Sequence, residues 1–280
     1  MRDVTPSLID ELTSVVSRAA AAILTARAGT LAPRRKADSS PVTAADEASE
    51  QIILDGLQQA LPGVPVVSEE AGAPADLTGE TFALVDPLDG TRELLAGRDE
   101  FCINLAVVWG GRAQIGIMSS PTAGLVWRTA AGGGAERLRL TPGAPASTVA
   151  ECRQIVPRSW PATGAIAAVS RSHLDVSTKA FLAKIPGVAP IASGSALKLC
   201  RVAEGAADVY PRLSTVSQWD VAAGDAIVTA AGGKVTTPAG APLAYGGGAG
   251  GFLVPGFIAW GDPSAAHRLG LAKGQGESVS

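Results

Sequence analysis

The sequence predicts an α/β protein, a layered α+β fold in which helices cover the faces of β-sheets. Two amphipathic helical patterns open the chain, one over residues 7–28 and one beginning at Thr43. Apolar runs between residues 101 and 140 are separated by short glycine turns, which is typical of an antiparallel meander. Strands and helices alternate after residue 165, and this alternation requires a sheet with helices packed on its faces.

The N-terminal segment is predicted to form two helices and a short strand. Apolar residues recur at helical spacing over residues 7–28. In the second helix, Thr43 is followed three residues later by Asp46, which is typical of a capping box, although Asp46 could also simply complement the helix dipole. Pro62-Gly63 ends this helix, and residues 64–67 form a strand that leads into two adjacent glutamates.

The second half of the chain is predicted to be a separate unit. A stretch rich in Pro, Ala and Ser at residues 141–148 has the composition of a boundary. We therefore divide the chain into an N-terminal part, residues 1–145, and a C-terminal part, residues 146–280. Predicted strands cover residues 165–169, 188–192 and 207–210, and predicted helices cover residues 175–184, 196–204 and 219–233.

The composition excludes several classes of function. The net charge is −3 with no long run of one sign, which argues against binding of nucleic-acid polymers. The chain has only two histidines, so a three-histidine zinc site is excluded and a Ser-His-Asp triad has few candidates. Carboxylates and hydroxyls must therefore carry most of the chemistry.

The sequence also predicts a cytoplasmic protein. Its first residues lack the charged-then-apolar order of a signal peptide, and no stretch is long and apolar enough for stable insertion in a membrane. Cys102, Cys152 and Cys200 lie far apart, as expected for small apolar residues in a reducing compartment. A peripheral contact with the inner membrane stays open, as does the choice between a monomer and a homodimer.

The most informative stretch begins with an apolar run at residues 82–85 that predicts a buried strand. Asp86 and Asp89 follow it, with Pro87 between them. Because proline lacks an N–H and fixes its own φ, we expect the strand to end and the chain to turn at Pro87. Thr91 is then positioned to cap a following helix.

This arrangement predicts metal-assisted chemistry on a phosphate ester. Asp86 and Asp89 repel each other unless a proton or a cation lies between them, and oxygen ligands suit a hard cation such as Mg²⁺. The amide N–H groups of Gly90 and Thr91, at the start of a helix, suit a phosphate. An acidic turn without any ligand is the alternative.

Four pieces of the sequence resemble, in order, the signatures of the inositol monophosphatase superfamily. They are Val42-Thr-Ala-Ala-Asp46 for V-T-x-x-D, Ser68-Glu-Glu70 for G/S-E-E, Asp86-Pro-Leu-Asp-Gly-Thr91 for D-P-[IL]-D-G-[ST], and Trp219-Asp-Val-Ala-Ala-Gly224 for W-D-x-A-A-G. The resemblance implies an α/β/α/β/α sandwich with the site between the two parts of the chain.

The resemblance also implies the roles of individual residues. Asp46 and Thr91 would orient the attacking water, and Glu70 would act from the outer shell of the catalytic site. Two or three Mg²⁺ ions would activate the water and stabilise the leaving oxygen, and Li⁺ would inhibit by taking one metal position. The implied metal ligands are Glu69, Asp86, Asp89, Asp220 and the carbonyl of Leu88.

The second half resembles the bisphosphate nucleotidase branch of this superfamily, which removes the 3′-phosphate from adenosine 3′,5′-bisphosphate, a by-product of sulfate assimilation. Inositol-specific relatives carry an acid near Arg212, whereas the planar fork of an arginine suits a second phosphate. The resemblance is carried by Ser170-Arg-Ser-His173, Gly194-Ser-Ala-Leu-Lys-Leu-Cys200, Val202-Ala-Glu-Gly205 and Tyr210-Pro-Arg212.

A phosphorylated nucleotide is therefore the expected small-molecule partner. The residues expected to bind it are Glu69, Leu88, Asp89, Gly90, Thr91, Gly194, Ser195, Arg212 and Asp220. The alternatives are a phosphatase for inositol phosphates or sugar bisphosphates, and a non-catalytic sensor of phosphorylated nucleotides.

Overall fold

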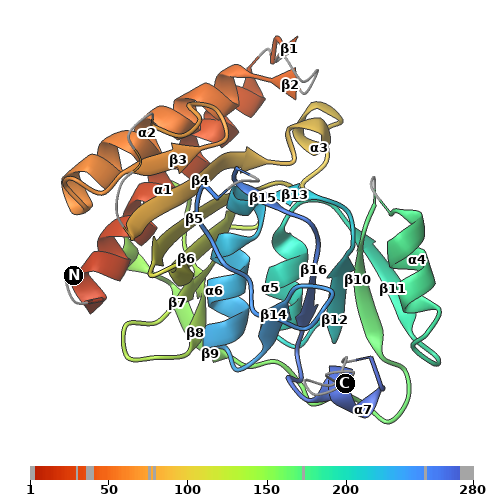
Figure 1. The fold of residues 1–280 in the computed structure, drawn as a ribbon. Coiled ribbons are helices and arrows are strands. Elements are labelled where there is room, and N and C mark those ends of the chain that lie inside the picture. The colour runs from red at the N-terminus through yellow and green to blue at the C-terminus, as the bar shows by residue number, and fades with distance from the viewer. Residues whose placement is uncertain are drawn as a thin grey trace.

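The computed structural model of the chain describes residues 4–29, 31–35, 41–74, 77, 80–171, 174–248 and 251–271. Its elements form an α/β/α/β/α arrangement of layers, which confirms the predicted fold class (Figure 1). The α-helices are α1 (Pro6–Ala28), α2 (Ala44–Ala60), α3 (Thr91–Leu95), α4 (Val176–Leu182), α5 (Leu197–Ala203), α6 (Ala222–Ala230) and α7 (Ala265–Arg268), with 3-10 turns η1 (Ala146–Thr148) and η2 (Gln218–Asp220). None of the described helices has the length and apolar character needed to cross a membrane.

The first sheet contains seven strands in sequence order. They are β3 (Val66–Ser68), β4 (Thr81–Asp89), β5 (Cys102–Trp109), β6 (Arg112–Ser120), β7 (Leu125–Thr129), β8 (Ala135–Arg139) and β9 (Glu151–Ile155). The pair β3–β4 is parallel and all the other pairs are antiparallel, so the predicted meander is confirmed. The sequence did not predict β9, which extends this sheet beyond residue 145.

The second sheet has the order β11-β10-β12-β16-β14 and mixes parallel with antiparallel pairs. Its strands are β10 (Ile166–Ser170), β11 (Ala189–Ser193), β12 (Val209–Arg212), β14 (Lys234–Thr236) and β16 (Phe257–Trp260). Two short pairs complete the structure, β1 (Arg34–Arg35) with β2 (Pro41–Val42) and β13 (Val216–Ser217) with β15 (Leu253–Val254). The sequence did not predict β14 or β16, because both are short and lie beyond the alternating pattern.

Helices cover both faces of the first sheet. Helices α1 and α2 pack on one face, and α5 and α6 fill the space between the two sheets, with α4 outside the second sheet (Figure 1). The alternation of side chains along β4 shows why the apolar run at residues 82–85 predicted a buried strand. Ala83 and Val85 pack toward α1 and α2, whereas Phe82 and Leu84 belong to the core between the sheets.

Helix α6 lies very close to the first sheet because β6 has a glycine beneath it. A Cβ atom on Gly116 would lie 2.2 Å from the carbonyl oxygen of Ala223. The turn η2, which ends at Asp220, leads directly into α6. Gly116 therefore sets the distance at which Asp220 approaches the end of β4.

We predict that Gly116→Ala destabilises the protein and disturbs the position of Asp220. The added methyl group meets backbone, which cannot move aside like a flexible side chain, so a loss of about 1–3 kcal/mol is expected. Thermal unfolding measures this loss, with Gly132→Ala as the matched control, since nothing lies within 4 Å of a Cβ at Gly132. A Gly116→Ala protein with wild-type stability would contradict the close approach.

Candidate active site

Strand β4 continues through Pro87, contrary to the prediction that it ends there. It pairs with β5 at Asp86 opposite Asn104 and again at Asp89 opposite Cys102, with a register shift between the two pairs. The shift is a β-bulge, where a proline is tolerated because no ladder hydrogen bond requires its N–H. Because of the bulge, Asp86 and Asp89 both lie at the end of β4, although the register of β4 against β5 changes between them.

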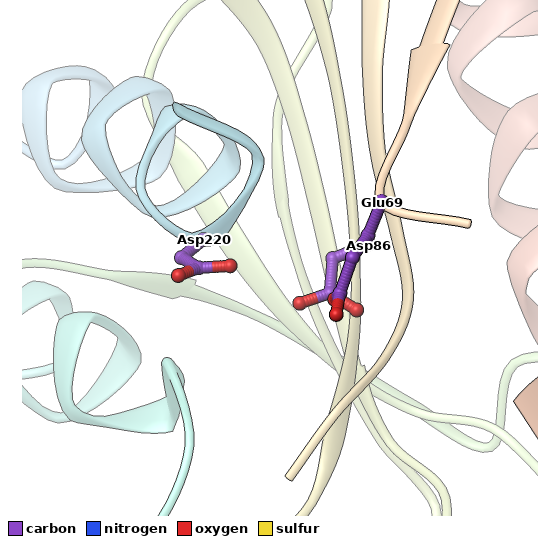
Figure 2. A group of neighbouring side chains, drawn as sticks. All are labelled: Glu69, Asp86 and Asp220. Atoms are coloured by element: carbon purple, nitrogen blue, oxygen red, sulfur yellow. The ribbon is translucent and has the colours of Figure 1, made fainter. Parts of the chain in front are cut away.

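Three carboxylates from separate segments meet at this bulge. One oxygen each of Glu69, Asp86 and Asp220 can be chosen so that all three lie within 4.8 Å of one another. Figure 2 shows Asp220 facing Glu69 and Asp86 across the gap between the helical segment and the strands. Asp220 thus turns toward the other acids rather than capping α6, whose N-cap residue is Val221. The predicted long helix from Trp219 is divided into η2 and α6.

The electrostatics of this cluster favour a bound proton or cation. Burial raises the pKa of Asp86 well above its usual value, and the charges of Glu69, Asp89 and Asp220 raise it further. The pKa of Asp220 is also raised well above its usual value, first by burial and then by Asp89 and Glu69. Buried like charges at this spacing are stable together only when a positive charge offsets them.

Two other predicted carboxylates lie outside this group of three. Asp89 is close enough for its charge to raise the pKa of Asp86 and Asp220, but its Oδ2 atom accepts a hydrogen bond from the backbone N–H of Ala196. Glu70 is half-buried, and its backbone N–H lies 3.4 Å from the hydroxyl of Ser68. The roles of Asp89 as a metal ligand and of Glu70 as a catalytic group therefore stay predictions.

Thr91 contacts Asp46, but it does not cap a helix. Gly90, with φ of +101°, is the N-cap residue of α3, and Thr91 is the first residue of that helix. The Thr91 hydroxyl lies 2.9 Å from Asp46 Oδ1 and 3.2 Å from the carbonyl oxygen of Leu88. The other oxygen of Asp46 accepts from the backbone N–H and the hydroxyl of Thr43, at 2.8 Å and 2.7 Å, which completes the predicted capping box. Asp46 therefore completes the capping box and also bonds to Thr91, while the part of this pair in orienting a water stays a prediction.

Helix α2 holds the site through two further residues whose roles the sequence did not reveal. Ser49 donates a hydrogen bond to the carbonyl of Pro87 at 2.7 Å, inside the bulge. Glu50 accepts from the Ser68 hydroxyl and, at 3.1 Å, from the backbone N–H of Ala71, on either side of the glutamate pair. A polar cluster at one end of an otherwise apolar helix face was the only available signal, because the partners lie far away in sequence.

A pocket extends from Asp220 into the second half of the chain. Arg212 lies in this pocket, half-buried, and its Nε atom is buried without a hydrogen-bond partner among the described residues. Gly194 and Ser195 line the same pocket, and their role in binding substrate stays a prediction. The remaining residues that line it are Asp89, Glu93, Ser170, Ala196, Lys198, Tyr210, Val216, Val221 and Phe257. Ser172 and His173 of the predicted motif lie outside the described residues.

The loop at Gly194 is fixed from two sides. The backbone N–H of Gly194 donates to Glu100 Oε2 at 2.8 Å, so Glu100 already occupies that amide group. Lys198 is buried, and its ammonium group donates to the carbonyls of Ser193, at 3.2 Å, and Ser195. No role was predicted for Lys198, although a lysine within the apolar run of α5 indicates a charge that is satisfied locally.

The sequence of this chain matches the family model of the inositol monophosphatase family over residues 6–269. The chain belongs to the inositol monophosphatase family. The 3′(2′),5′-bisphosphate nucleotidase CysQ of Escherichia coli strain K12 is 36% identical over 245 residues, which cover 85% of this chain and 94% of that protein. The histidinol-phosphatase of Mycobacterium tuberculosis is 32% identical over 220 residues, which cover 76% of this chain and 80% of that protein.

Solved structures agree with this membership. The crystal structure of CysQ from Bacteroides thetaiotaomicron, a bacterial member of the inositol monophosphatase family, aligns with a TM-score of 0.78 and 31% identity. The alignment covers 91% of this chain and 97% of that chain. The protein is therefore a phosphatase of the inositol monophosphatase family, and its layered fold is the fold of that family.

The residues at the bulge fit the Mg²⁺ that the inositol monophosphatase family generally uses. The donors that converge are carboxylate oxygens from Glu69, Asp86 and Asp220, and hard cations prefer such ligands. The pKa values of Asp86 and Asp220 stay raised although the positive charge of Arg212 lowers that of Asp220, so Arg212 does not offset the repulsion within the cluster. These three residues would hold a metal ion, which would supply Lewis-acid stabilisation of a phosphate oxygen.

We predict that Asp86→Asn nearly abolishes turnover and removes stabilisation by Mg²⁺. In wild type, Mg²⁺ at about 100 times its Kd should add about 2.7 kcal/mol to the free energy of unfolding. In chelator, the variant should be at least as stable as wild type, because one buried charge is gone. Thermal unfolding with and without Mg²⁺ measures both effects, and wild-type turnover in the absence of divalent ions would contradict the metal site.

The pH dependence of stability should follow the same carboxylates. The folded-state pKa of Asp86 lies above the unfolded value of about 3.9, so the metal-free fold loses stability as the pH rises past 3.9 through the folded-state pKa. Asp86→Asn should weaken this dependence in chelator. An unchanged pH profile would show that Asp86 does not carry the unfavourable charge.

We further predict that the two functions of Asp46 can be separated. Thr91→Val removes the hydroxyl at the site and should lower kcat by roughly 100-fold or more, the usual effect of losing a proton-transfer group, with little change in stability. Thr43→Ala removes only the cap and should lower stability by about 0.5–2 kcal/mol with kcat nearly retained. Equal effects of the two variants on kcat would contradict a distinct role for Thr91.

Proposed function

We propose that this protein is a Mg²⁺-dependent 3′(2′),5′-bisphosphate nucleotidase that hydrolyses adenosine 3′,5′-bisphosphate to AMP and phosphate. The observation that carries the proposal is Arg212. Its buried Nε has no hydrogen-bond partner among the described residues, and it lies in the same pocket as Asp220. A buried, unpaired guanidinium donor beside a site for one phosphate calls for a second anionic group on the substrate.

The position of Arg212 is fixed by the second sheet. Arg212 is the last residue of β12 and pairs with Phe257 of β16, so the sheet holds its backbone in place. Tyr210 and Phe257 stand at right angles, with ring centroids 5.1 Å apart, and both line the pocket. These rings give the pocket an apolar part of its wall, which suits a nucleoside.

The chain's own groups account for the remaining steps. When the Thr91 hydroxyl donates to Asp46, its lone pairs are left to accept a hydrogen bond from a water molecule and orient it. The water attacks phosphorus and its proton passes through Thr91 toward Asp46. The bond between phosphorus and the 3′-oxygen breaks, and that oxygen takes a proton from solvent, which gives AMP and phosphate. The amide groups of Gly90 and Thr91 would bind phosphate oxygens, and Glu70 would assist from outside the carboxylate cluster.

The names of the relatives support this substrate without deciding it. Several curated relatives at 35–37% identity are described as 3′(2′),5′-bisphosphate nucleotidases. A histidinol-phosphatase is also a relative, so the family includes other substrates. In the proposed role, the enzyme recycles a by-product of sulfur metabolism in the cytoplasm.

A substrate panel tests the proposal. Phosphate release is measured with Mg²⁺ on adenosine 3′,5′-bisphosphate, its 5′-phosphosulfate form, inositol 1-phosphate and fructose 1,6-bisphosphate. We expect the highest kcat/KM on adenosine 3′,5′-bisphosphate and inhibition by Li⁺. A preference for inositol 1-phosphate or fructose 1,6-bisphosphate would identify one of the alternative phosphatases, and no turnover of any substrate would favour a sensor.

We predict that Arg212→Ala impairs only substrates with a second phosphate. The fall in kcat/KM on adenosine 3′,5′-bisphosphate should correspond to a loss of about 1.5–3 kcal/mol of transition-state stabilisation, the range for a hydrogen bond to a charged group. Turnover of adenosine 3′-phosphate should change little, and Arg139→Ala, an exposed arginine on β8, is the control. Equal losses on both substrates would place Arg212 outside the phosphate site.

A further inference from the structure

We infer that Glu93 is a specificity-determining residue that accepts a hydrogen bond from the nucleoside of the substrate. The inference rests on the proposed nucleotidase function and concerns the same pocket. Glu93 is the third residue of α3 and only 8% exposed, and it lines the pocket together with Arg212 and Asp220. Neither the carboxylate cluster nor the Asp46–Thr91 pair includes it.

The location of Glu93 is tightly defined by its neighbours. A Cβ atom on Gly194 would lie 3.0 Å from the Cγ of Glu93, so the side chain packs directly against the Gly194 loop. The nearby Arg171 directs its fork at Glu100, with contacts of 3.0 Å and 2.7 Å, and lies close enough for the charge of Glu93 to raise its pKa as well. An acid at a helix start often only complements the helix dipole, but such an acid is normally solvated rather than enclosed in a pocket.

The charge of Glu93 restricts what can lie beside it. A carboxylate only accepts hydrogen bonds, and it repels the phosphates of the proposed substrate. The neutral hydrogen-bond donors of adenosine 3′,5′-bisphosphate are its 2′-hydroxyl and its exocyclic amino group. Glu93 thus faces one of these two donors, while Arg212 faces the second phosphate. A site built around such an acceptor rejects analogues that lack the donor.

Two analogues distinguish the two donors. The 2′-deoxy form of adenosine 3′,5′-bisphosphate lacks the hydroxyl, and purine riboside 3′,5′-bisphosphate lacks the amino group without gaining another donor. We measure kcat/KM on the parent and both analogues for wild type, Glu93→Ala, Glu93→Gln and the control Asp99→Asn. Asp99 is an acid in the segment between α3 and β5 that pairs with Arg27 and does not line this pocket.

We expect wild type and Asp99→Asn to disfavour one analogue by about tenfold or more, as for a lost hydrogen bond to a charged group. In Glu93→Ala the ratio of kcat/KM on the parent to that on this analogue should fall to about one, because neither nucleotide can then donate a hydrogen bond to residue 93. Glu93→Gln, which keeps an acceptor oxygen, should retain part of it. If Glu93→Ala is inactive or misfolded, as judged by thermal unfolding, the Glu93→Gln ratios decide.

Unchanged discrimination in both Glu93 variants would overturn the inference and leave the nucleotidase function intact. Equal turnover of all three nucleotides by wild type would do the same. If wild type hydrolyses none of them while hydrolysing inositol 1-phosphate, the proposed function fails as well, and the wild-type measurements alone reveal this.

Discussion

Repulsion among buried carboxylates is the constraint on which this structure depends. Glu69, Asp86 and Asp220 come from three segments, and the pKa values of Asp86 and Asp220 show that their charges are unfavourable where they lie. Packing must therefore hold them together until a cation offsets the repulsion. Gly116 supplies part of that packing, because it allows α6 to lie against the first sheet and brings Asp220 toward Asp86.

Helix α2 gives the site its precision. Asp46, Ser49 and Glu50 project from its first two turns and bind three different pieces of the site, namely Thr91, the bulge at Pro87 and the turn that carries Glu69. A helix fixes the relative positions of residues three and four apart, so these pieces are held by one rigid element rather than by separate loops. The same arrangement explains why the capping residue Asp46 can also serve the reaction.

The site draws on both halves of the chain. Glu69 follows β3, Asp86 lies in β4, and Asp220 comes from η2 in the second half. The pocket beyond Asp220 is lined by β12, β16 and the loop at Gly194, together with Asp89 and Glu93 from the first half. Arg212 and Glu93 lie in the same pocket. In the proposed function the arginine attracts a phosphate and the glutamate repels it, so together they would fix the direction in which a nucleotide enters.

The sequence by itself determined the layered fold class, the first meander, the capping box at Thr43 and the acids of the metal cluster, because each is encoded in local periodicity or in a short motif. It missed β9, β14 and β16 and ended β4 too early, since short strands and a proline in a bulge gain their stability from neighbouring strands. The resemblance already implied the pairing of Thr91 with Asp46. Only the tertiary structure decided that Thr91 begins α3 rather than capping it, and that Ser49 and Glu50 support the site. It alone places Glu93 in the pocket with Arg212, because these residues are far apart in sequence and nothing local specifies which faces of the two halves meet.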